Sequence, residues 1–428
     1  MQNFLGASFR SFAGRILGAL TALVASFTIT STLSIDESGL FFLGLGFAIF
    51  FSHILKFGLD TFVLKKCAIF LSESRHSDFL ALVLTSTVIS IAGSFLFYLM
   101  SYMVEWAGVY EYARYLVLAI PAAVCMALMG IIAHSLHATG FVFIATVTNI
   151  ALNYILFSLC VWFLNPSDAV EALKYFVACC LLALLIQIAI TVLLFARSGF
   201  KLLALHKAGL PRIDYRETYQ TTIPLWLVVI SQQFNQWGAQ FVSSIYVEEA
   251  DLALLAIAMR LAMIVPMIMT SVNLVVSPRF ASLFHQGEIK EIEVVLKKSL
   301  KLLAVASLFV FITIIFFGDD LLRIFGSEYA EARILLTILV SGHLVNALTG
   351  PVGRLLMMSG YEKDIRNSSI VVAILGIALA FILVSWYGVY GAALATAITV
   401  ATQNIYLAYL VNDRLQISIL KIYKNILH

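Results

Sequence analysis

Long apolar runs separated by short polar connections fill nearly the whole of this chain. A helix that crosses a membrane needs about 20 consecutive apolar residues, and a window of about 19 residues finds twelve such segments. They lie near 12–33, 39–63, 79–104, 112–136, 141–164, 171–196, 222–246, 251–277, 298–317, 334–357, 366–386 and 388–411. The apolar residues are continuous, as in 81–100, whereas barrel strands alternate. We therefore expect an all-α integral membrane protein with twelve transmembrane helices.

Composition narrows the functional class further. Hydrophobic residues make up 61% of the chain and charged residues 12%, whereas an average soluble protein has about 25% charged residues. The five cysteines form no CxxC pair, so neither a disulfide framework nor a zinc site is indicated. A net charge of +3 does not favour nucleic acid as a partner. The chain has no P-loop, HExxH or GxSxG motif, so we expect a protein that is not an enzyme and uses no cofactor or metal.

Basic residues gather on alternate connections. With the N-terminus in the cytoplasm, 21 of the 27 Lys and Arg residues fall in inner connections and four in outer ones, and the outer connections carry thirteen acids. Lys and Arg are enriched on the cytoplasmic side of membrane proteins. The asymmetry would collapse if one span in the middle were added or removed. It predicts that both termini are cytoplasmic.

Two halves of the chain repeat each other. The acidic outer turn at Asp36 and Glu37 recurs at Glu248 and Glu249, and the step 139–141 (TGF) after the fourth span recurs as 359–361 (SGY) after the tenth. An offset of six spans preserves the direction of crossing, so the repeats are parallel, as in one established transporter architecture. We expect an N-terminal six-helix lobe at 1–200, a cytoplasmic linker at 201–221 and a C-terminal six-helix lobe at 222–428.

One inner connection is amphipathic. Residues 288–301 (EIKEIEVVLKKSLK) predict a helix that lies on the membrane surface and leads into the ninth span. The alternative is a plain solvated basic anchor on the cytoplasmic side.

Ionisable residues inside the hydrocarbon are costly and mark candidate sites. Arg260 lies about nine residues into the eighth span, roughly 13 Å below its outer end at 1.5 Å per residue. It is a candidate ligand for an anion; the alternative is a structural ion pair, or hydrogen bonds to carbonyls at a helix break near Pro266. Arg15, in the first span, either reaches the inner surface or contributes to a cavity.

Three polar residues of the second span share one face of a helix. His53, Lys56 and Asp60 follow i, i+3, i+7 spacing. Lys56 and Asp60 can neutralise each other, which lowers the cost of burying either. The pattern fits either a simple intrahelical salt bridge or a cavity that binds protons or anions.

The seventh span is unusually rich in amides. Gln232, Asn235, Gln236, Gln240 and Ser243 advance by three or four residues and predict one polar face. Such a face must contact protein or water and not lipid. It provides either hydrogen bonds between helices or a lining for hydroxyl-rich ligands such as sugars, to which Asn149 and Asn153 of the fifth span can add.

Taken together, several segments resemble the polysaccharide-export branch of the MATE-like MOP superfamily, and in particular its Wzx-type flippases of O-antigen and capsule assembly. The resemblance covers essentially the whole chain and rests on the paired six-span halves, FAGRILGAL at 12–20, the TGF and SGY steps, Asn149 with Asn153, and GVYGAALAT at 388–396.

This resemblance implies a V-shaped bundle of two lobes in the bacterial inner membrane. The implied activity is transfer of an undecaprenyl-diphosphate-linked oligosaccharide from the cytoplasmic to the periplasmic leaflet, driven by a proton or sodium gradient. Arg260, Arg15 and Lys56, the last beside Asp60, would attract the diphosphate, and the amides of the seventh span would contact sugars. Membrane lipids, a polysaccharide polymerase and a chain-length regulator are the partners that it implies.

Three other classes are less consistent with the sequence. Lipid II flippases of the superfamily usually have two further C-terminal spans, and this chain stops after the twelfth. Multidrug or cation antiporters typically have an acid in the first span, where this chain has none. Polysaccharide polymerases generally carry a large loop outside the membrane, but no outer connection here exceeds about 15 residues.

Overall fold

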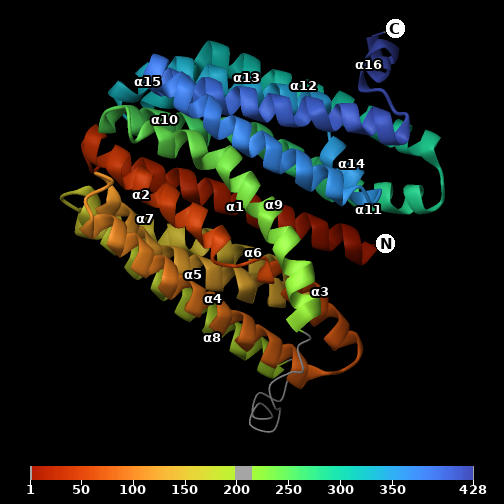
Figure 1. Cartoon of the computed structure of the whole chain (residues 1–428), viewed down its shortest axis with the longest axis horizontal. Coiled ribbons are helices and arrows are strands. Elements are labelled where there is room, and N and C mark those ends of the chain that lie inside the picture. The colour runs from red at the N-terminus through yellow and green to blue at the C-terminus, as the bar shows by residue number, and fades with distance from the viewer. Residues whose placement is uncertain (1, 198–214, 428) are drawn as a thin grey trace. The chain divides into compact units, whose positions relative to one another are not determined.

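The computed structural model describes residues 2–197 and 215–427, and regular structure within those residues is entirely helical (Figure 1). The chain divides into two compact units, Met1–Ile230 and Ser231–His428, which we call unit 1 and unit 2. The division falls within the helix α9, so each unit holds part of it.

Unit 1 is a bundle around α2, α5 and α8. Its elements are α1 (Gln2–Thr30), α2 (Ile35–Ile54), α3 (Leu59–Ser72), α4 (His76–Trp106), α5 (Ala113–Ala138), α6 (Val142–Thr146), the π-helical turn η1 (Val147–Ala151), α7 (Leu152–Leu164), α8 (Ala169–Arg197) and the first part of α9 (Tyr215–Ser243). Helix α5 packs against α2, α4 and α8. The rings of Phe41 and Phe157 stack 5.3 Å apart and Phe176 packs edge-on at 5.2 Å from Phe157, which joins α2, α7 and α8.

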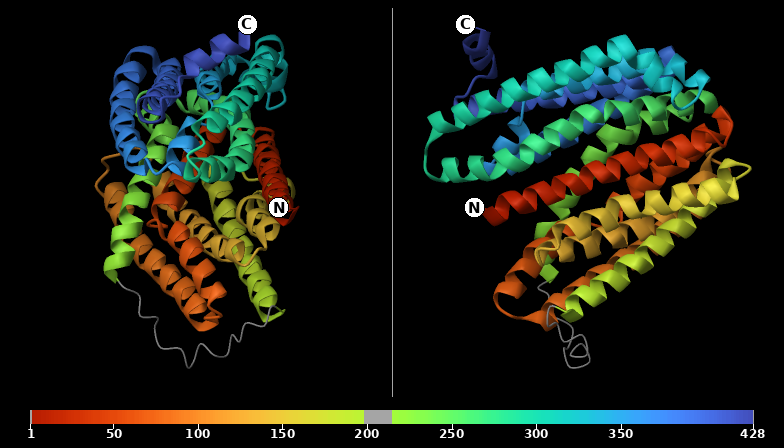
Figure 2. Two further views of the ribbon diagram at one scale, coloured as in Figure 1. Left: turned by 90° about the vertical axis from the view of Figure 1, so that its right-hand side faces the viewer. Right: turned by 180° about the vertical axis from the view of Figure 1, so that it is seen from behind.

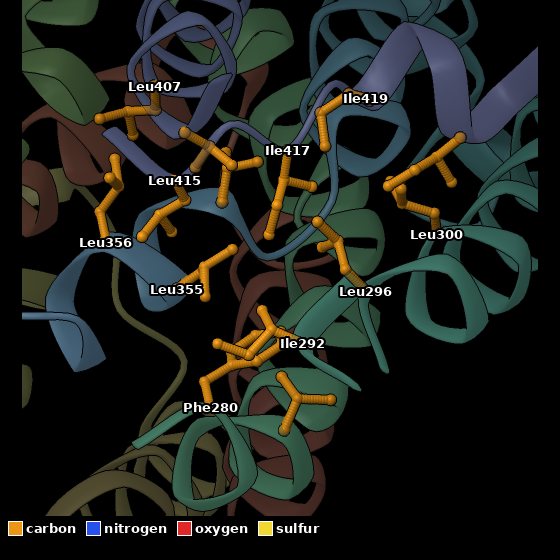
Figure 3. Close-up of a cluster of buried hydrophobic side chains, with 14 of the residues drawn as sticks. Phe280, Ile292, Leu296, Leu300, Leu355, Leu356, Leu407, Leu415, Ile417 and Ile419 are labelled. Carbon is orange, nitrogen blue, oxygen red and sulfur yellow. The ribbon is translucent and has the colours of Figure 1, made fainter. Parts of the chain in front are cut away.

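Unit 2 is built in the same way from long helices. After the end of α9 come α10 (Glu249–Ala262), α11 (Ile264–His285), α12 (Ile289–Arg323), the 3-10 turn η3 (Ser327–Ala332), α13 (Arg333–Thr349), α14 (Val352–Met358), α15 (Glu362–Leu415) and α16 (Ile419–Leu427). One end of the unit has a large apolar core in which Phe280, Leu296, Leu355 and Ile417 are all buried (Figure 3). This core holds α16 against the bundle.

The twelve predicted spans correspond to the observed helices. Among the described residues, ten helices are long and apolar enough to cross a membrane. The 54-residue α15 contains Gly388 with φ 55° and ψ −137°, a non-helical kink that divides it into the two predicted spans. Helix α9 has 29 residues, enough to cross, although its amides make it too polar to be counted.

The second span differs from the prediction of one helix over 39–63. Helix α2 ends at Ile54 and α3 begins at Leu59, because Phe57 and Gly58 adopt left-handed conformations with φ 51° and 71°. A Cβ atom on Gly58 would lie 2.7 Å from the carbonyl oxygen of Thr222, so only glycine fits here. His53 therefore lies on a different helix from Asp60, and the single helical face that we predicted for them is wrong.

The tenth span is also broken, since α13 stops at Thr349 and α14 starts at Val352 after Gly350 with φ 76°.

The segment 288–301, in contrast, is not the separate helix on the membrane surface that we predicted. It is the first part of the continuous α12, which runs for 35 residues beside α11 (Figure 2). The buried Ile292, Leu296 and Leu300 explain this, because they bind that segment into the apolar core of unit 2.

Candidate functional site

Lys56 lies in the interruption between α2 and α3 and is nearly buried, with 8% of its surface exposed. Its ammonium nitrogen lies 3.9 Å from Oδ2 of Asp60, which forms the predicted ion pair. That distance is too long for a hydrogen bond, so the pairing is purely electrostatic. The Oδ1 atom of Asp60 instead accepts a hydrogen bond from the backbone N–H of Thr61, at 2.7 Å.

The lysine side chain lies against a glycine of α5. A Cβ atom on Gly130 would come within 2.9 Å of Cε and 3.1 Å of Nζ of Lys56. Glycine in the middle of a helix costs about 0.5 to 1 kcal/mol relative to alanine. The absence of a side chain at Gly130 gives the ammonium group of Lys56 room to approach the backbone of α5.

Two side-chain donors from other helices bind carbonyl groups at the interruption, of which that of Ile54 also accepts the backbone N–H of Phe57 at 3.0 Å. Trp226 Nε1 donates to the carbonyl oxygen of Ile54 at 2.8 Å, and Ser90 Oγ donates to that of Leu55 at 2.7 Å. The rings of Phe57 and Trp226 lie 5.4 Å apart. Because water is absent from a bilayer core, unpaired carbonyls there cost several kcal/mol each, and these contacts hold the interruption in place.

Sequence reasoning missed two histidines of α5. Gly130, His134 and His137 follow i, i+4, i+7 spacing, which places them on one face of α5. His134 Nδ1 lies 2.8 Å from the carbonyl oxygen of Gly130, and the rings of the two histidines are 5.8 Å apart. His134 interacts electrostatically with Asp60, and His137 with Arg15. Arg15 itself is exposed on α1.

His53 does not face this group in the predicted way. Its Nδ1 atom lies 2.9 Å from the carbonyl oxygen of Ile49 and 3.3 Å from Ser52 Oγ, both on its own helix. His53 still interacts electrostatically with Lys56 and Asp60. The cluster of ionisable residues in unit 1, which we call the α5 cluster, therefore comprises His53, Lys56, Asp60, His134, His137 and Arg15.

Arg260 belongs to unit 2, in the last turn of α10. It is half-buried and lies three residues before Met263, where α10 ends and α11 begins. A cation in the last turn of a helix is favoured by the helix dipole. The predicted helix break therefore occurs immediately beyond Arg260.

The predicted polar residues of α9 differ in burial. Gln232 is exposed, Asn235 and Gln236 are half-buried, and Gln240 is 1% exposed. Ser243 is buried and donates to the carbonyl oxygen of Ala239 at 2.8 Å. Gln233, which we had not selected, is also buried.

Asn149 lies within the π-helical turn η1 and Asn153 at the start of the following helix α7, where the predicted fifth span was a regular helix. Asn149 is half-buried, whereas Asn153 is 1% exposed and contacts Cys180 of α8. Nearby, Gln187 Nε2 donates to Thr148 Oγ1 and to the carbonyl oxygen of Met129, each at 3.2 Å. Asn153 thus belongs to a buried polar contact among α5, η1, α7 and α8.

In unit 1 the structure brings Lys56 together with Asp60, and Arg15 together with His137. Arg260 and most of the α9 amides belong to unit 2. Among the described residues, no group of three or more His, Cys, Asp or Glu is arranged to hold a metal ion. The chemistry on offer is that of cations, one carboxylate, imidazoles and amides, which suits binding of anions, protons and hydroxyl groups rather than bond cleavage.

Comparison with known proteins places this arrangement in a family context. Residues 224–382 match the MatE family. A probable low-salt glycan biosynthesis flippase of Haloferax volcanii is 24% identical over 194 residues, which cover 44% of this chain. The match spans only 41% of that relative.

Solved structures resemble the chain over nearly its full length. An inward-facing multidrug resistance MATE family transporter of the MOP superfamily superimposes with a TM-score of 0.74 at 15% identity, covering 95% of this chain and 96% of the other. The lipid II flippase MurJ, in an inward closed conformation, gives 0.72 at 16% identity, covering 98% and 90%. The chain is thus a multi-pass integral membrane protein that shares the fold of these solved structures, and its residues 224–382 match the MatE family.

Proposed function

We propose that this chain is a flippase for an undecaprenyl-diphosphate-linked oligosaccharide, such as an O-antigen or capsule repeat unit. It moves this substrate from the cytoplasmic to the periplasmic leaflet by ion-coupled alternating access. The observation that carries the proposal is Lys56, a nearly buried ammonium group whose acidic partner is 3.9 Å away.

Burial of an ammonium group is costly even when it is paired. The effective penalty is several kcal/mol per ion, and it is recovered only where the geometry is good and hydrogen bonds complete the shell. Asp60 gives Lys56 charge compensation without a hydrogen bond. A diphosphate supplies both, because its oxygens are strong acceptors with negative charge.

Arg260 and the α9 amides contribute from the second half of the chain. A guanidinium group binds phosphate oxygens through two parallel hydrogen bonds, whereas an ammonium group acts as a point charge. Gln232, Asn235 and Gln236 have exposed or half-buried side chains that offer donors and acceptors to sugar hydroxyls. On this proposal Arg260, Lys56 and Arg15 attract the diphosphate, and the amides contact the glycan.

The comparisons support this assignment at a coarser level. The relative from Haloferax volcanii is described as a glycan biosynthesis flippase, and MurJ as a lipid II flippase. Both descriptions are of flippases. The glycan and the coupling ion of this chain are part of our proposal.

Complementation of a flippase-null strain tests the role of the two cations. We expect Lys56→Met and Arg260→Ala to abolish surface polysaccharide while membrane abundance stays normal. The matched controls are Lys65→Met and Arg279→Ala, which remove exposed basic residues from α3 and α11. Normal polysaccharide in the Arg260→Ala strain would overturn the assignment of that residue.

Cysteine labelling tests the proposed orientation, in which both termini and the linker at 201–221 are cytoplasmic and the lobes are 1–200 and 222–428. On a background without the five native cysteines, Glu111→Cys should react with a membrane-impermeant maleimide in intact cells. Lys290→Cys should react only after the cells are permeabilised. Both positions are exposed, so a reversed pattern contradicts the orientation. Pull-down with a polysaccharide polymerase and a chain-length regulator tests the proposed partners.

A multidrug or cation antiporter is the second candidate, favoured by the likeness to the MATE transporter fold. The sequence of α1 contains no acid, and Asp60 of α3, whose side chain is 16% exposed, is the acid of the α5 cluster. Efflux of a cationic dye by cells that express the chain, lost in Asp60→Asn but retained in Lys56→Met, would favour this function over the flippase.

A further inference from the structure

The C-terminal helix α16 runs across the direction of the long helices of unit 2 (Figures 1 and 2). It follows a short non-helical turn in which Gln416 is left-handed, with φ 58°. Ile417 and Ile419 share the apolar core at one end of the unit with Leu296 and Leu300 of α12 (Figure 3). With nine residues, α16 is too short to cross a bilayer. It is therefore a candidate for a helix that lies in the plane of the membrane surface.

One face of α16 packs against the bundle. Ile419 and Ile422 are buried in the apolar core of unit 2. The hydroxyl group of Tyr423 donates to the carbonyl oxygen of Leu348, at 2.9 Å. This carbonyl lies next to the break between α13 and α14. These contacts fix which side of α16 is turned away from the protein.

The other side of α16 combines a large apolar side chain with two cations. Leu420 is 77% exposed, and Lys421 and Lys424 are exposed as well. Leu420 and Lys421 each lie about one turn from Lys424, so the three side chains are neighbours on the helix surface. Both charged residues of α16 are lysines. An exposed apolar side chain beside basic ones is typical of helices that bind at the membrane interface.

The exposed side chains of α12 show where the hydrocarbon of the membrane begins. Lys301 is exposed, whereas the exposed residues of 302–317 are all apolar. Such a continuous apolar surface faces lipid. Leu296 and Leu300, which share their core with α16, come immediately before this boundary. Helix α16 therefore lies at the level of the lipid headgroups.

We propose that α16 is a docking surface for the anionic headgroups of the cytoplasmic leaflet. Lys421 and Lys424 contact the headgroup phosphates, and Leu420 enters the boundary with the acyl chains. Anionic lipids give this leaflet a negative surface potential, which attracts basic side chains close to it. A second copy of this chain would bring two further lysines to the same face, so charge favours the lipid. This docking surface rests on the proposed orientation of the chain and not on its substrate.

Hydrogen exchange of the full chain in nanodiscs measures the docking, because a lipid that binds folded α16 lowers the population of its open form. Nanodiscs of phosphatidylcholine are compared with nanodiscs in which about a third of the lipid is phosphatidylglycerol. We expect the amides of α16 to exchange more slowly in the anionic nanodiscs by about fivefold per lysine, or about 25-fold for both. High salt should remove most of this difference.

Two double variants and a control separate the charge of the lysines from their packing. Lys421→Gln with Lys424→Gln should exchange at the same rate in both kinds of nanodisc. Lys421→Arg with Lys424→Arg keeps the charge and should retain the difference. Lys65→Gln with Lys174→Gln is the matched control, since it removes the same charge from exposed positions of unit 1. This control should leave the exchange of α16 at its wild-type values.

Three outcomes contradict the docking surface. The first is equal exchange of α16 in the two kinds of nanodisc, and the second is a difference that persists in Lys421→Gln with Lys424→Gln. The third is slower exchange when inorganic phosphate is added to the neutral nanodiscs, which would indicate a site for a free ion. If the double variant aggregates, Lys421→Gln replaces it and should lose about fivefold of the difference. The flippase proposal is tested separately, by complementation with the Lys56 and Arg260 variants.

Discussion

The indole nitrogen of Trp226 donates a hydrogen bond to the carbonyl oxygen of Ile54, 2.8 Å away, although the two residues are 172 positions apart. This contact joins the first part of α9 to the end of α2 within unit 1. It adds a second donor to a carbonyl that the left-handed turn at Phe57 and Gly58 removes from regular helical bonding and that accepts the backbone N–H of Phe57 at 3.0 Å. The geometry of Lys56 therefore depends on a tryptophan far from it in sequence.

Replacing that tryptophan isolates the contribution of the hydrogen bond. Trp226→Phe keeps a ring beside Phe57 and removes one of the two donors to the Ile54 carbonyl, since the backbone N–H of Phe57 remains 3.0 Å away. We expect a loss of about 0.5 to 2 kcal/mol in stability and weaker transport, measured by thermal unfolding in detergent and by complementation.

Trp237, on the same helix, is the matched control. Its indole nitrogen is buried without a hydrogen-bond partner among the described residues. Trp237→Phe should therefore leave the midpoint of thermal unfolding unchanged or slightly raised. Equal destabilisation by the two substitutions would show that loss of ring volume, and not the hydrogen bond, is responsible.

Gly130 provides a second test of how Lys56 is held. In Gly130→Ala the new methyl group would lie 2.9 Å from Lys56 Cε and 3.1 Å from Nζ, so the flexible end of the lysine must move. The substitution raises helix propensity by about 0.5 to 1 kcal/mol. We therefore expect unchanged or higher thermal stability together with reduced polysaccharide export.

Gly318→Ala controls for the change in helix propensity. Its Cβ would meet Arg333 and Ile314 at ordinary contact distances of 3.8 and 3.9 Å. This variant should export polysaccharide normally. Export at the wild-type level in Gly130→Ala would mean that the position of the Lys56 ammonium group does not matter for transport.

Much of the architecture could be predicted because hydrophobicity and charge record it directly. The apolar runs give the number and order of the helices, down to the division at Gly388 within α15. The interruption at Phe57 and Gly58 could not be predicted, since the residues that stabilise it come from α4 and α9. The continuity of 288–301 with the ninth span could not be predicted either, because the apolar core that holds this segment in one helix is built from several other helices.

The candidate site was predictable only in part, for a related reason. Lys56 and Asp60 are close in sequence, so their spacing revealed the pair. His134 lies 74 residues beyond Asp60, and the sequence around a histidine in an apolar run does not indicate which residues it contacts. Asn153 has the same ambiguity, and it lies in a buried contact with α8 and not on an exposed face.

Glu37 joins two helices at the outer end of unit 1 by the same kind of long-range capping. Its Oε2 atom accepts a hydrogen bond from the backbone N–H of Ala169, at the start of α8, at 2.6 Å. An acceptor at a helix N-terminus contributes about 0.5 to 2 kcal/mol. Glu37→Ala should lower the thermal unfolding midpoint. Asp36→Ala, an exposed acid in the same turn of α2, should have a smaller effect; equal effects would assign the loss to the dipole of α2.

The ion pair of Lys56 and Asp60 separates stability from function. Asp60→Asn keeps an oxygen to accept the N–H of Thr61 but leaves Lys56 as an uncompensated, nearly buried charge, so we expect a loss of about 3 kcal/mol in stability. Adding Lys56→Met removes that charge and should recover most of the lost stability. A reversed pair is a poorer test, because Asp60 lies in the first turn of α3, where the helix dipole disfavours a lysine.

Transport should not recover with stability in the Lys56→Met, Asp60→Asn double variant. If Lys56 binds the diphosphate, the double variant unfolds near the wild-type temperature and is abundant in the membrane but exports no polysaccharide. If the pair is only a structural salt bridge, export returns with stability, since the neutral residues replace both charges. Thermal unfolding and surface polysaccharide are measured on the wild type, both single variants and the double variant. Together they decide whether Lys56 binds the diphosphate or only forms a structural salt bridge with Asp60.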